Sequence, residues 1–509
     1  MRIKKSFFNA VSNSSILIVR SILLFVVRIV FVKTLGKSLL GLDSLLTNLL
    51  VVLSITDLGI STAINYSLYK PIHDKDYKKV SALMSFYKKM YNFLGIIVLI
   101  IGIAFIPFLK FIVTDNIPNL EFIYILYLLT TASTYFISYK DSLLYADQKN
   151  YELTFIIGVT YILIYIIRLI SLIIYPDFIL FIMIQLVGLV LQRILINRYI
   201  TKKYDKIDFN SKIEISKTEQ KEIKKSVTSM FLYKVGGYLI SGTDSAVISA
   251  NSNLGVAVVG IYINYLSITS MMDSIVYRAF GGMTASYGDL AVESDTDVLE
   301  NVYNITALFA FIVYGIITIE FWFLLTPFIK FCFGADFGLS MPIISVICAN
   351  FYLNGILRTL EIIKDATGLY NNDKYATLIQ TVINLALSII LCKYFGLIGV
   401  VLGTLISIIL VPLWNKPYII YKHIFKKNMF GFIKDQCKYL LVLLLIFCIC
   451  LFIINFIPIA NQFISFIVYG SIIMVISLLI IYIFFRNNEQ FKYLLDQFIN
   501  GFNKILKRA

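Results

Sequence analysis

Histidine is almost absent from this chain of 509 residues, which contains only His73 and His423. This scarcity argues against a histidine-based metal site and against a Ser-His-Asp arrangement. The sequence also lacks a Walker A pattern, so no P-loop is available for ATP hydrolysis. The six cysteines show no metal-ligand spacing and are interpreted as apolar fillers: Cys332, Cys348, Cys392, Cys437, Cys448 and Cys450. The sequence therefore predicts no metal and no cofactor.

Charged residues are scarce as well, and apolar residues are correspondingly abundant. Charged residues make up 15% of the chain and hydrophobic residues 59%, whereas soluble domains carry about 25% and about 45–50%. Because a bilayer crossing takes about 20 apolar residues, the recurring apolar runs predict an all-α integral membrane protein with about 14 transmembrane helices. The expected spans are 10–32, 39–65, 86–113, 120–142, 152–175, 178–199, 227–249, 254–283, 301–326, 340–364, 374–394, 396–421, 437–458 and 463–485.

The net charge of +15 comes mainly from lysines and arginines in alternate loops between these spans. The segment 201–226 is the most basic of them. By the positive-inside rule these loops and both termini are cytoplasmic. The excess charge therefore indicates membrane topology and not nucleic-acid binding. One expected inside loop, 289–300, is acidic and departs from the pattern. No long external loop is predicted that could hold a catalytic domain, which indicates a non-enzyme.

The chain also contains an internal repeat. Leu35-Gly36 is followed by Gly41, and Leu254-Gly255 is followed by Gly260 with the same gap, about 220 residues later. The pair KNY at 149–151 and DKY at 373–375 has a similar offset. We interpret the repeat as two pseudo-symmetric six-helix lobes, 1–200 and 227–425, joined by the cytoplasmic linker 201–226. Transporters often bind substrate between such repeats. Chance similarity among apolar segments is the alternative.

The remaining segments are a helix pair at 426–486 and a tail at 487–509. In the tail, apolar residues recur at helical spacing between charged ones. This pattern is typical of an amphipathic helix on the inner membrane surface.

Several ionisable residues lie inside expected spans, where each costs about 2.5–3.5 kcal/mol at a helix centre. They should therefore face a hydrated cavity or pair with one another: Arg20, Arg28, Asp57, Arg168, Lys234, Asp244, Asp273, Arg278 and Glu320. Arginine pairs bidentately with phosphate oxygens, so Arg20, Arg28, Arg168 and Lys234 are candidate ligands for an anionic substrate. The structural alternative is that they reach the interfaces or are neutralised by Asp57 or Asp244. Arg358 and Glu361 are expected to form a structural ion pair.

Several segments resemble the Wzx-type polysaccharide flippases of the MOP exporter superfamily. They are TDLGISTAI at 56–64 with SLYKP at 67–71, YKVGGY at 233–238 with GTD at 242–244, GIYINY at 260–265, and Gly399-Val400 with Gly403-Thr404. The resemblance runs in order along nearly the whole chain.

The resemblance implies two six-helix, MATE-like lobes around a cationic cavity in a bacterial cytoplasmic membrane. It implies transport of undecaprenyl-diphosphate-linked oligosaccharide to the outer leaflet for capsule or exopolysaccharide assembly. Its partners would be this anionic lipid-linked glycan, membrane lipids, a polysaccharide polymerase and glycosyltransferases. Arg20, Arg28, Lys234 and Arg168 would line the cavity, and Asp57 and Asp244 could couple ions. A lipid II flippase, a multidrug exporter, a membrane polymerase and an assembly scaffold remain alternatives.

Overall fold

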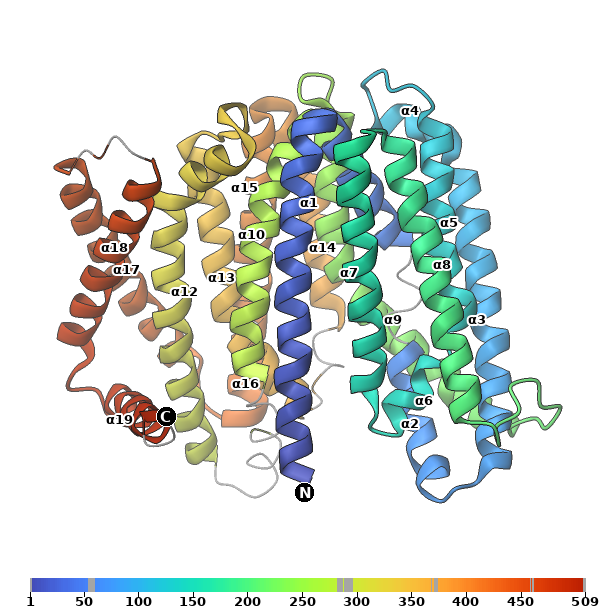
Figure 1. Cartoon of the computed structure of the whole chain (residues 1–509). Helices are drawn as coiled ribbons and strands as arrows, with labels where there is room; N and C mark the ends of the chain where they lie inside the picture. The colour runs from blue at the N-terminus through green and yellow to red at the C-terminus, as the bar shows by residue number, and fades with distance from the viewer. Residues whose placement is uncertain are drawn as a thin grey trace. The chain divides into compact units, whose positions relative to one another are not determined.

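The computed structural model of this protein describes residues 2–53, 60–281, 287, 296–367, 369, 374–457, 459 and 462–506, and every regular element in these ranges is helical (Figure 1). Eleven helical segments of the described chain are long and apolar enough to cross a membrane. Each overlaps one of the expected spans. The other three expected spans, 10–32, 39–65 and 227–249, coincide wholly or largely with α1 (Arg2–Leu53) and α9 (Lys217–Ala250). The protein is thus an all-helical, multi-pass membrane protein, and the total of 14 spans stays a prediction.

The chain forms two compact units, Met1–Gly260 and Ile261–Ala509. Besides α1 and α9, the first unit contains α2 (Ile60–His73), α3 (Tyr77–Phe105), α4 (Leu109–Ile112), α5 (Leu120–Ser138), α6 (Asp141–Ala146), α7 (Asn150–Ile174) and α8 (Phe178–Lys203). Helix α10 (Gly255–Gly281) continues from the first unit into the second. The second unit contains α12 (Thr296–Phe333), α13 (Met341–Thr367), α14 (Lys374–Phe395), α15 (Leu397–Leu410), α16 (Pro412–Ile420), α17 (Phe430–Asn455), α18 (Gln462–Phe485) and α19 (Glu489–Leu506). The lobe boundaries inferred from the repeat remain a prediction.

Helix α1 is a helical hairpin with its turn at Gly36. This glycine has a φ of 84°, a left-handed conformation that costs a residue with a side chain about 1–2 kcal/mol. Arg28 and Ser44, each eight positions from Gly36, are joined by a hydrogen bond, which requires the two arms to run antiparallel. The predicted break between the first two spans is therefore present, and Figure 1 shows the reversal at the end of the first arm.

The second copy of the glycine motif has the same geometry and packs against the first. Gly255, the counterpart of Gly36, has a φ of 68°. A Cβ atom on Gly41 would lie 1.6 Å from the carbonyl oxygen of Val256, and one on Gly260 would lie 2.7 Å from the carbonyl oxygen of Lys37. The second glycine of each motif thus lies against the backbone that directly follows the first glycine of the other motif. This reciprocal contact supports a true repeat over chance similarity.

Apolar side chains in the first unit face outward along the membrane spans, while tyrosines fill the interior. On α3, Phe93 and Ile100 are more than half exposed, whereas Tyr87 and Tyr91 are buried. The buried Tyr124 hydroxyl, for example, donates to the carbonyl of Gly102 at 3.0 Å. Such an arrangement suits a lipid solvent, since hydrocarbon accepts apolar side chains but not unpaired polar groups.

Within the expected linker 201–226, only residues 204–216 lie between helices α8 and α9. Helix α8 extends to Lys203 and α9 begins at Lys217, after the N-cap Ser216. Between them, Ile207, Phe209 and Ile215 are buried. The Asp208 amide donates to Ser81 on α3 at 2.9 Å, and Lys88 of α3 donates to Asn210 at 2.6 Å. The segment 204–216 is therefore a strap fastened to α3.

In the second unit, α14 and α15 form a tight helical hairpin. A Cβ atom on Gly399 would lie 2.2 Å from the carbonyl oxygen of Leu391, and one on Gly403 would lie 2.7 Å from the amide nitrogen of Ser388. The two helices thus pack closely at these glycines. Gly396, with a φ of 64°, forms the turn between the two helices.

The tail forms the predicted helix, α19, which packs against α12 (Figure 1). Its Phe491 is buried against Phe485 and Tyr482 of α18, whereas Phe498 is 74% exposed. An apolar face of this helix is thus divided between the protein and its surroundings, as in helices that lie at a membrane surface.

The acidic segment that departed from the charge pattern has a local partner. At the start of α12, Asp297 and Glu300 accept hydrogen bonds from Lys427 at 2.6 and 2.5 Å. These carboxylates raise the pKa of the Lys427 amine above its ordinary value. The described part of the acidic segment is thus compensated by a basic residue that follows α16.

Candidate functional site

Arg28 lies in a polar cluster inside the first unit. Its guanidinium group donates to the Ser44 hydroxyl at 3.2 Å and attracts the Asp43 carboxylate. Tyr127 of α5 donates a hydrogen bond to the same carboxylate. Because Gly36 folds the two arms of α1 together, residues fifteen positions apart in sequence reach one site. Arg28, Asp43, Ser44 and Tyr127 form what we call the Asp43 cluster.

Arg168 of α7 lies close to this cluster and is only 6% exposed. Its guanidinium carbon lies 3.5 Å from the centre of the Phe181 ring, and it also attracts Asp43. No described ion pair includes Arg168, and its Nε has no hydrogen-bond partner in the described chain. A buried guanidinium group is costly unless paired, so this one is a candidate to receive an anion.

Arg20 is held in a similar way on the first arm of α1. Its guanidinium carbon lies 3.8 Å from the centre of the Tyr161 ring of α7. No ion pair of the described residues includes Arg20. Cation–π contacts stabilise an arginine by about 0.5–2 kcal/mol while leaving donors of the guanidinium group available. Two of the predicted cations are thus held by aromatic rings.

The cations occupy different depths. At 1.5 Å per residue, Arg28 lies about 12 Å and Arg20 about 24 Å along the helix from the turn at Gly36. Arg168 is about 9 Å from the end of α7 at Ile174 by the same measure. The hydrocarbon core is about 30 Å thick, so these distances from the helix ends are compatible with positions inside it.

The other predicted site residues are only partly described. Lys234 lies on α9, but its side chain is outside the described part, and Asp57 lies outside the described residues altogether. Asp244 is buried on α9 beside Ser245, whose hydroxyl accepts a hydrogen bond from Asn48 of α1 at 3.0 Å. The structure thus brings Arg28 and Arg168 to one carboxylate, places Arg20 further along the same helix, and leaves the grouping with Lys234 as a prediction.

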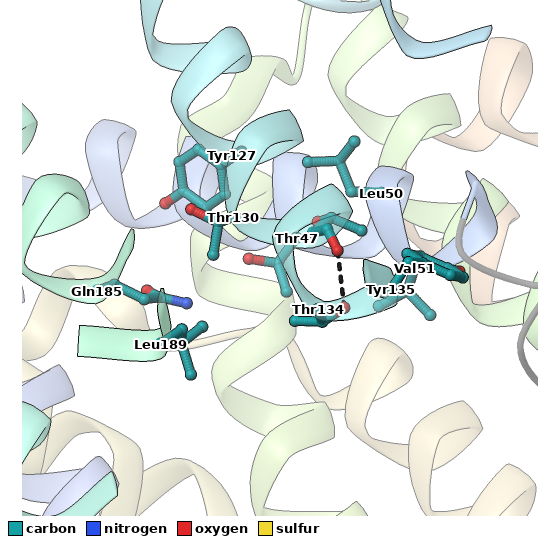
Figure 2. A pocket seen from close by; sticks show the side chains of 10 residues that line it. Thr47, Leu50, Val51, Tyr127, Thr130, Thr134, Tyr135, Gln185 and Leu189 are labelled. Atoms are coloured by element: carbon teal, nitrogen blue, oxygen red, sulfur yellow. Dashed lines mark hydrogen bonds between the residues drawn. The ribbon is translucent and has the colours of Figure 1, made fainter. Parts of the chain in front are cut away.

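A pocket of about 290 Å³ opens beside the Asp43 cluster. Figure 2 shows Gln185 and Leu189 of α8 facing Thr130 and Thr134 of α5 across it. Its walls combine hydroxyl and amide groups with apolar side chains and carry no charged residue: Thr47, Leu50, Val51, Tyr127, Thr130, Thr131, Thr134, Tyr135, Gln185 and Leu189. Tyr127 belongs both to the pocket and to the Asp43 cluster.

Sequence reasoning missed Asp43 and Tyr127. Asp43 lies near the start of the expected span 39–65 and was not singled out there, and Tyr127 is one of 34 tyrosines. The signal that could have found Asp43 is its position in the same antiparallel hairpin as Arg28, opposite that residue.

In the second unit, the structure pairs charges that the sequence had singled out. Arg358 contacts Glu361 at 2.8 Å, which confirms the expected ion pair, and Asp273 of α10 at 3.1 Å. Tyr314 donates to Asp273 at 2.8 Å, and Lys416 contacts Glu361. Asp273 is thus neutralised inside the protein, as expected for a carboxylate at bilayer depth.

Neither a protein-family model nor a curated protein sequence matches the chain. Solved structures do match it. "Lipid II flippase MurJ, inward closed conformation" superposes with a TM-score of 0.68 and 18% identity, covering 94% of this chain and 99% of that one. An inward-facing multidrug resistance MATE family transporter of the MOP superfamily gives 0.62 and 16%, covering 78% and 94%. A MATE protein in the bent conformation gives 0.51 and 15%, covering 81% and 95%. This chain therefore has the fold shared by MurJ and the MATE transporters of the MOP superfamily.

Proposed function

We propose that this protein is a flippase for lipid-linked oligosaccharides. It would move undecaprenyl-diphosphate-linked glycan from the cytoplasmic to the outer leaflet of a bacterial cytoplasmic membrane, as Wzx-type proteins do, for capsule or exopolysaccharide assembly. The observation that carries the proposal is the state of Arg20 and Arg168, two cations within the membrane spans that rest on aromatic rings and form no described ion pair. Such groups are retained at a cost of about 2.5–3.5 kcal/mol each on insertion scales, which a diphosphate would offset.

In the proposed mechanism, the arginines bind the diphosphate, the glycan moves through a hydrated space and the prenyl chain stays in the bilayer. Arg28 and Lys234 would add positive charge, and Asp57 or Asp244 could couple transport to an ion gradient. Arginine suits the diphosphate because its fork of N–H groups matches two phosphate oxygens. The repeat supports alternating access, since inverted or parallel repeats commonly rock about a shared site.

The fold comparison supports a lipid-linked substrate over a soluble drug. The MurJ structure covers 94% of this chain, which leaves about 30 residues unmatched. Helices α17 to α19 span 430–506 and exceed that number, so the match must extend into this final segment. The MATE transporter covers only 78%. A lipid II flippase is thus the second candidate, on this observation.

A multidrug exporter is disfavoured by the charges of the first unit. An exporter of cations needs a net acidic cavity, whereas Arg28, Arg168 and Arg20 outnumber Asp43 among the described charges around the cluster. The same excess of positive charge attracts an anionic headgroup.

The proposal is tested by Arg20→Ala and Arg168→Ala, with surface polysaccharide and membrane protein level measured together. A lost charge-assisted hydrogen bond costs about 1.5–3 kcal/mol, so export should fall by about ten- to a hundredfold in rate. Arg20→Lys should recover part of it. Arg278→Ala is the matched control, because Arg278 is exposed near the end of α10. Normal export by both alanine variants at normal protein level would refute the role of these arginines.

A further inference from the structure

We propose that the pocket between α1, α5 and α8 binds one neutral sugar ring of the transported lipid-linked glycan. The inference rests on the proposed function and names a second subsite for the same substrate. The cationic cluster would take the diphosphate, and this pocket, which shares Tyr127 with the cluster, would take a sugar.

The polar groups of the pocket match sugar hydroxyls. Gln185, Thr47 and Thr131 line it, and their side chains form no hydrogen bond to any described residue. An amide offers two donors and an acceptor, and each hydroxyl offers a donor and an acceptor. Sugar hydroxyls also donate and accept, so these groups can satisfy them in either direction. A pocket without charged walls favours a neutral ligand over a phosphate.

Other hydroxyls of the pocket are already committed as donors. Thr130 donates to the carbonyl of Leu126 at 2.7 Å, Thr134 donates to that of Thr131 at 2.7 Å, and Tyr127 donates to Asp43. Their oxygens can therefore only accept from a ligand. The site thus combines fixed acceptors with the adaptable Gln185 amide, which favours a ligand rich in hydroxyl donors.

The apolar walls and the volume agree with a single ring. Leu50, Val51 and Leu189 supply apolar surface, and Tyr127 and Tyr135 supply aromatic surface; a pyranose presents C–H groups on its faces and hydroxyls at its rim. The volume of about 290 Å³ lies at the lower end of ligand pockets, about 300–1,000 Å³. It would hold roughly ten waters at about 30 Å³ each, enough room for one sugar but not for an oligosaccharide.

The depth of the pocket gives a reason for a polar ligand. Thr47 lies about 16 Å along the helix from Gly36, and Gln185 about 10 Å from the start of α8. At that depth an unsatisfied amide is unfavourable by several kcal/mol. Water would satisfy these groups between transport cycles, and sugar hydroxyls would replace it when substrate binds.

The test compares two lipids with the full-length protein in nanodiscs, with binding measured by native mass spectrometry. One probe is a polyprenyl diphosphate that carries a neutral disaccharide, and the other is the same lipid without sugar. Gln185→Leu and Thr131→Val should weaken binding of the glycosylated lipid about five- to tenfold each and leave the sugar-free lipid unchanged. Ser133→Ala is the control, because this α5 hydroxyl bonds its own helix at Thr130 and is not part of the pocket.

The possible failures are distinguishable. If the wild-type protein binds both lipids and the variants match it for both, the pocket holds water only and this inference falls while the proposed function stands. If the variants lose both lipids equally, the pocket is structural, which also overturns the inference. If the wild-type protein binds neither lipid, the proposed function falls and the inference falls with it.

Discussion

Replacing Gly41 by alanine probes the contact between the two glycine motifs. The new Cβ would lie 1.6 Å from the carbonyl oxygen of Val256 and 3.0 Å from the amide nitrogen of Gly260. Both neighbours are backbone atoms, so no side chain can rotate away. To reach an ordinary carbon–oxygen separation, the start of α10 must move by well over 1 Å from the second arm of α1.

The expected cost follows from overpacking a rigid contact. Inserted methyl groups cost about 1–3 kcal/mol where neighbours can adjust, and a backbone neighbour places Gly41→Ala at the upper end, about 3 kcal/mol. For a cooperative unit of about 250 residues, each kcal/mol lowers Tm by about 2–4 °C, which gives a fall of about 6–12 °C. The assay is thermal unfolding of the full chain in detergent, followed by size-exclusion chromatography.

Two other glycines separate steric contact from backbone strain. Gly36 has a left-handed φ, but nothing lies within 4 Å of the point that a Cβ atom would occupy, so Gly36→Ala should cost only about 1–2 kcal/mol. Gly431 is helical with nothing within 4 Å, so its alanine variant should gain up to about 1 kcal/mol. A Gly41→Ala protein as stable as the Gly431→Ala protein would refute the close contact.

Three further outcomes follow from contacts in the second unit. Asp273→Asn should lower stability by about 1–3 kcal/mol, less than for a fully buried pair, because the Arg358 side chain is 37% exposed; an unchanged Tm would contradict this. Phe491→Ala should weaken the packing of α19 against α18 by about 3 kcal/mol and expose the tail to protease in membranes, whereas Phe498→Ala should not. Equal digestion of the two variants would argue against the role of Phe491 in holding α19. Lys427→Gln should speed hydrogen exchange at 296–300. In the wild-type protein, the carboxylates of Asp297 and Glu300 raise the pKa of Lys427 above 10.5. Slow hydrogen exchange at 296–300 should therefore persist up to pH 10.5 and be lost only as the pH rises through the raised pKa. Loss of this protection near pH 9 would count against the ion pair.

The spans could be predicted because their signal is local. Length and hydropathy decide whether a segment crosses a bilayer, and each of the eleven described spans was expected within a few residues at one or both ends. One error lies at α12, which runs from Thr296 to Phe333 where 301–326 was expected. Its extra turns lie outside the most apolar stretch and are stabilised by tertiary contacts, such as that of Lys427 with Asp297.

The glycine motifs were predictable for a different reason. A positive φ and a close backbone approach both favour glycine, so the repeated glycines at 36 and 255 indicated the two turns by residue type alone. By contrast, the partners of the charged groups come from helices distant in sequence. Nothing local in the sequence indicates that Tyr127 meets Asp43, or that Asp273 meets Arg358 across 85 positions. Of the Asp43 cluster, the sequence thus indicated Arg28 but not the residues that surround it.

The strap at 204–216 has a consequence for how this protein can move. A connector held along its length by Phe209, by Ser81 and by Lys88 travels with the helices beneath it. It cannot act as a flexible linker between the two halves of the sequence, even though its polar, basic composition is typical of one. Any hinge must therefore lie beyond the first turn of α9, because Glu219 in that turn still contacts Lys79 of α3.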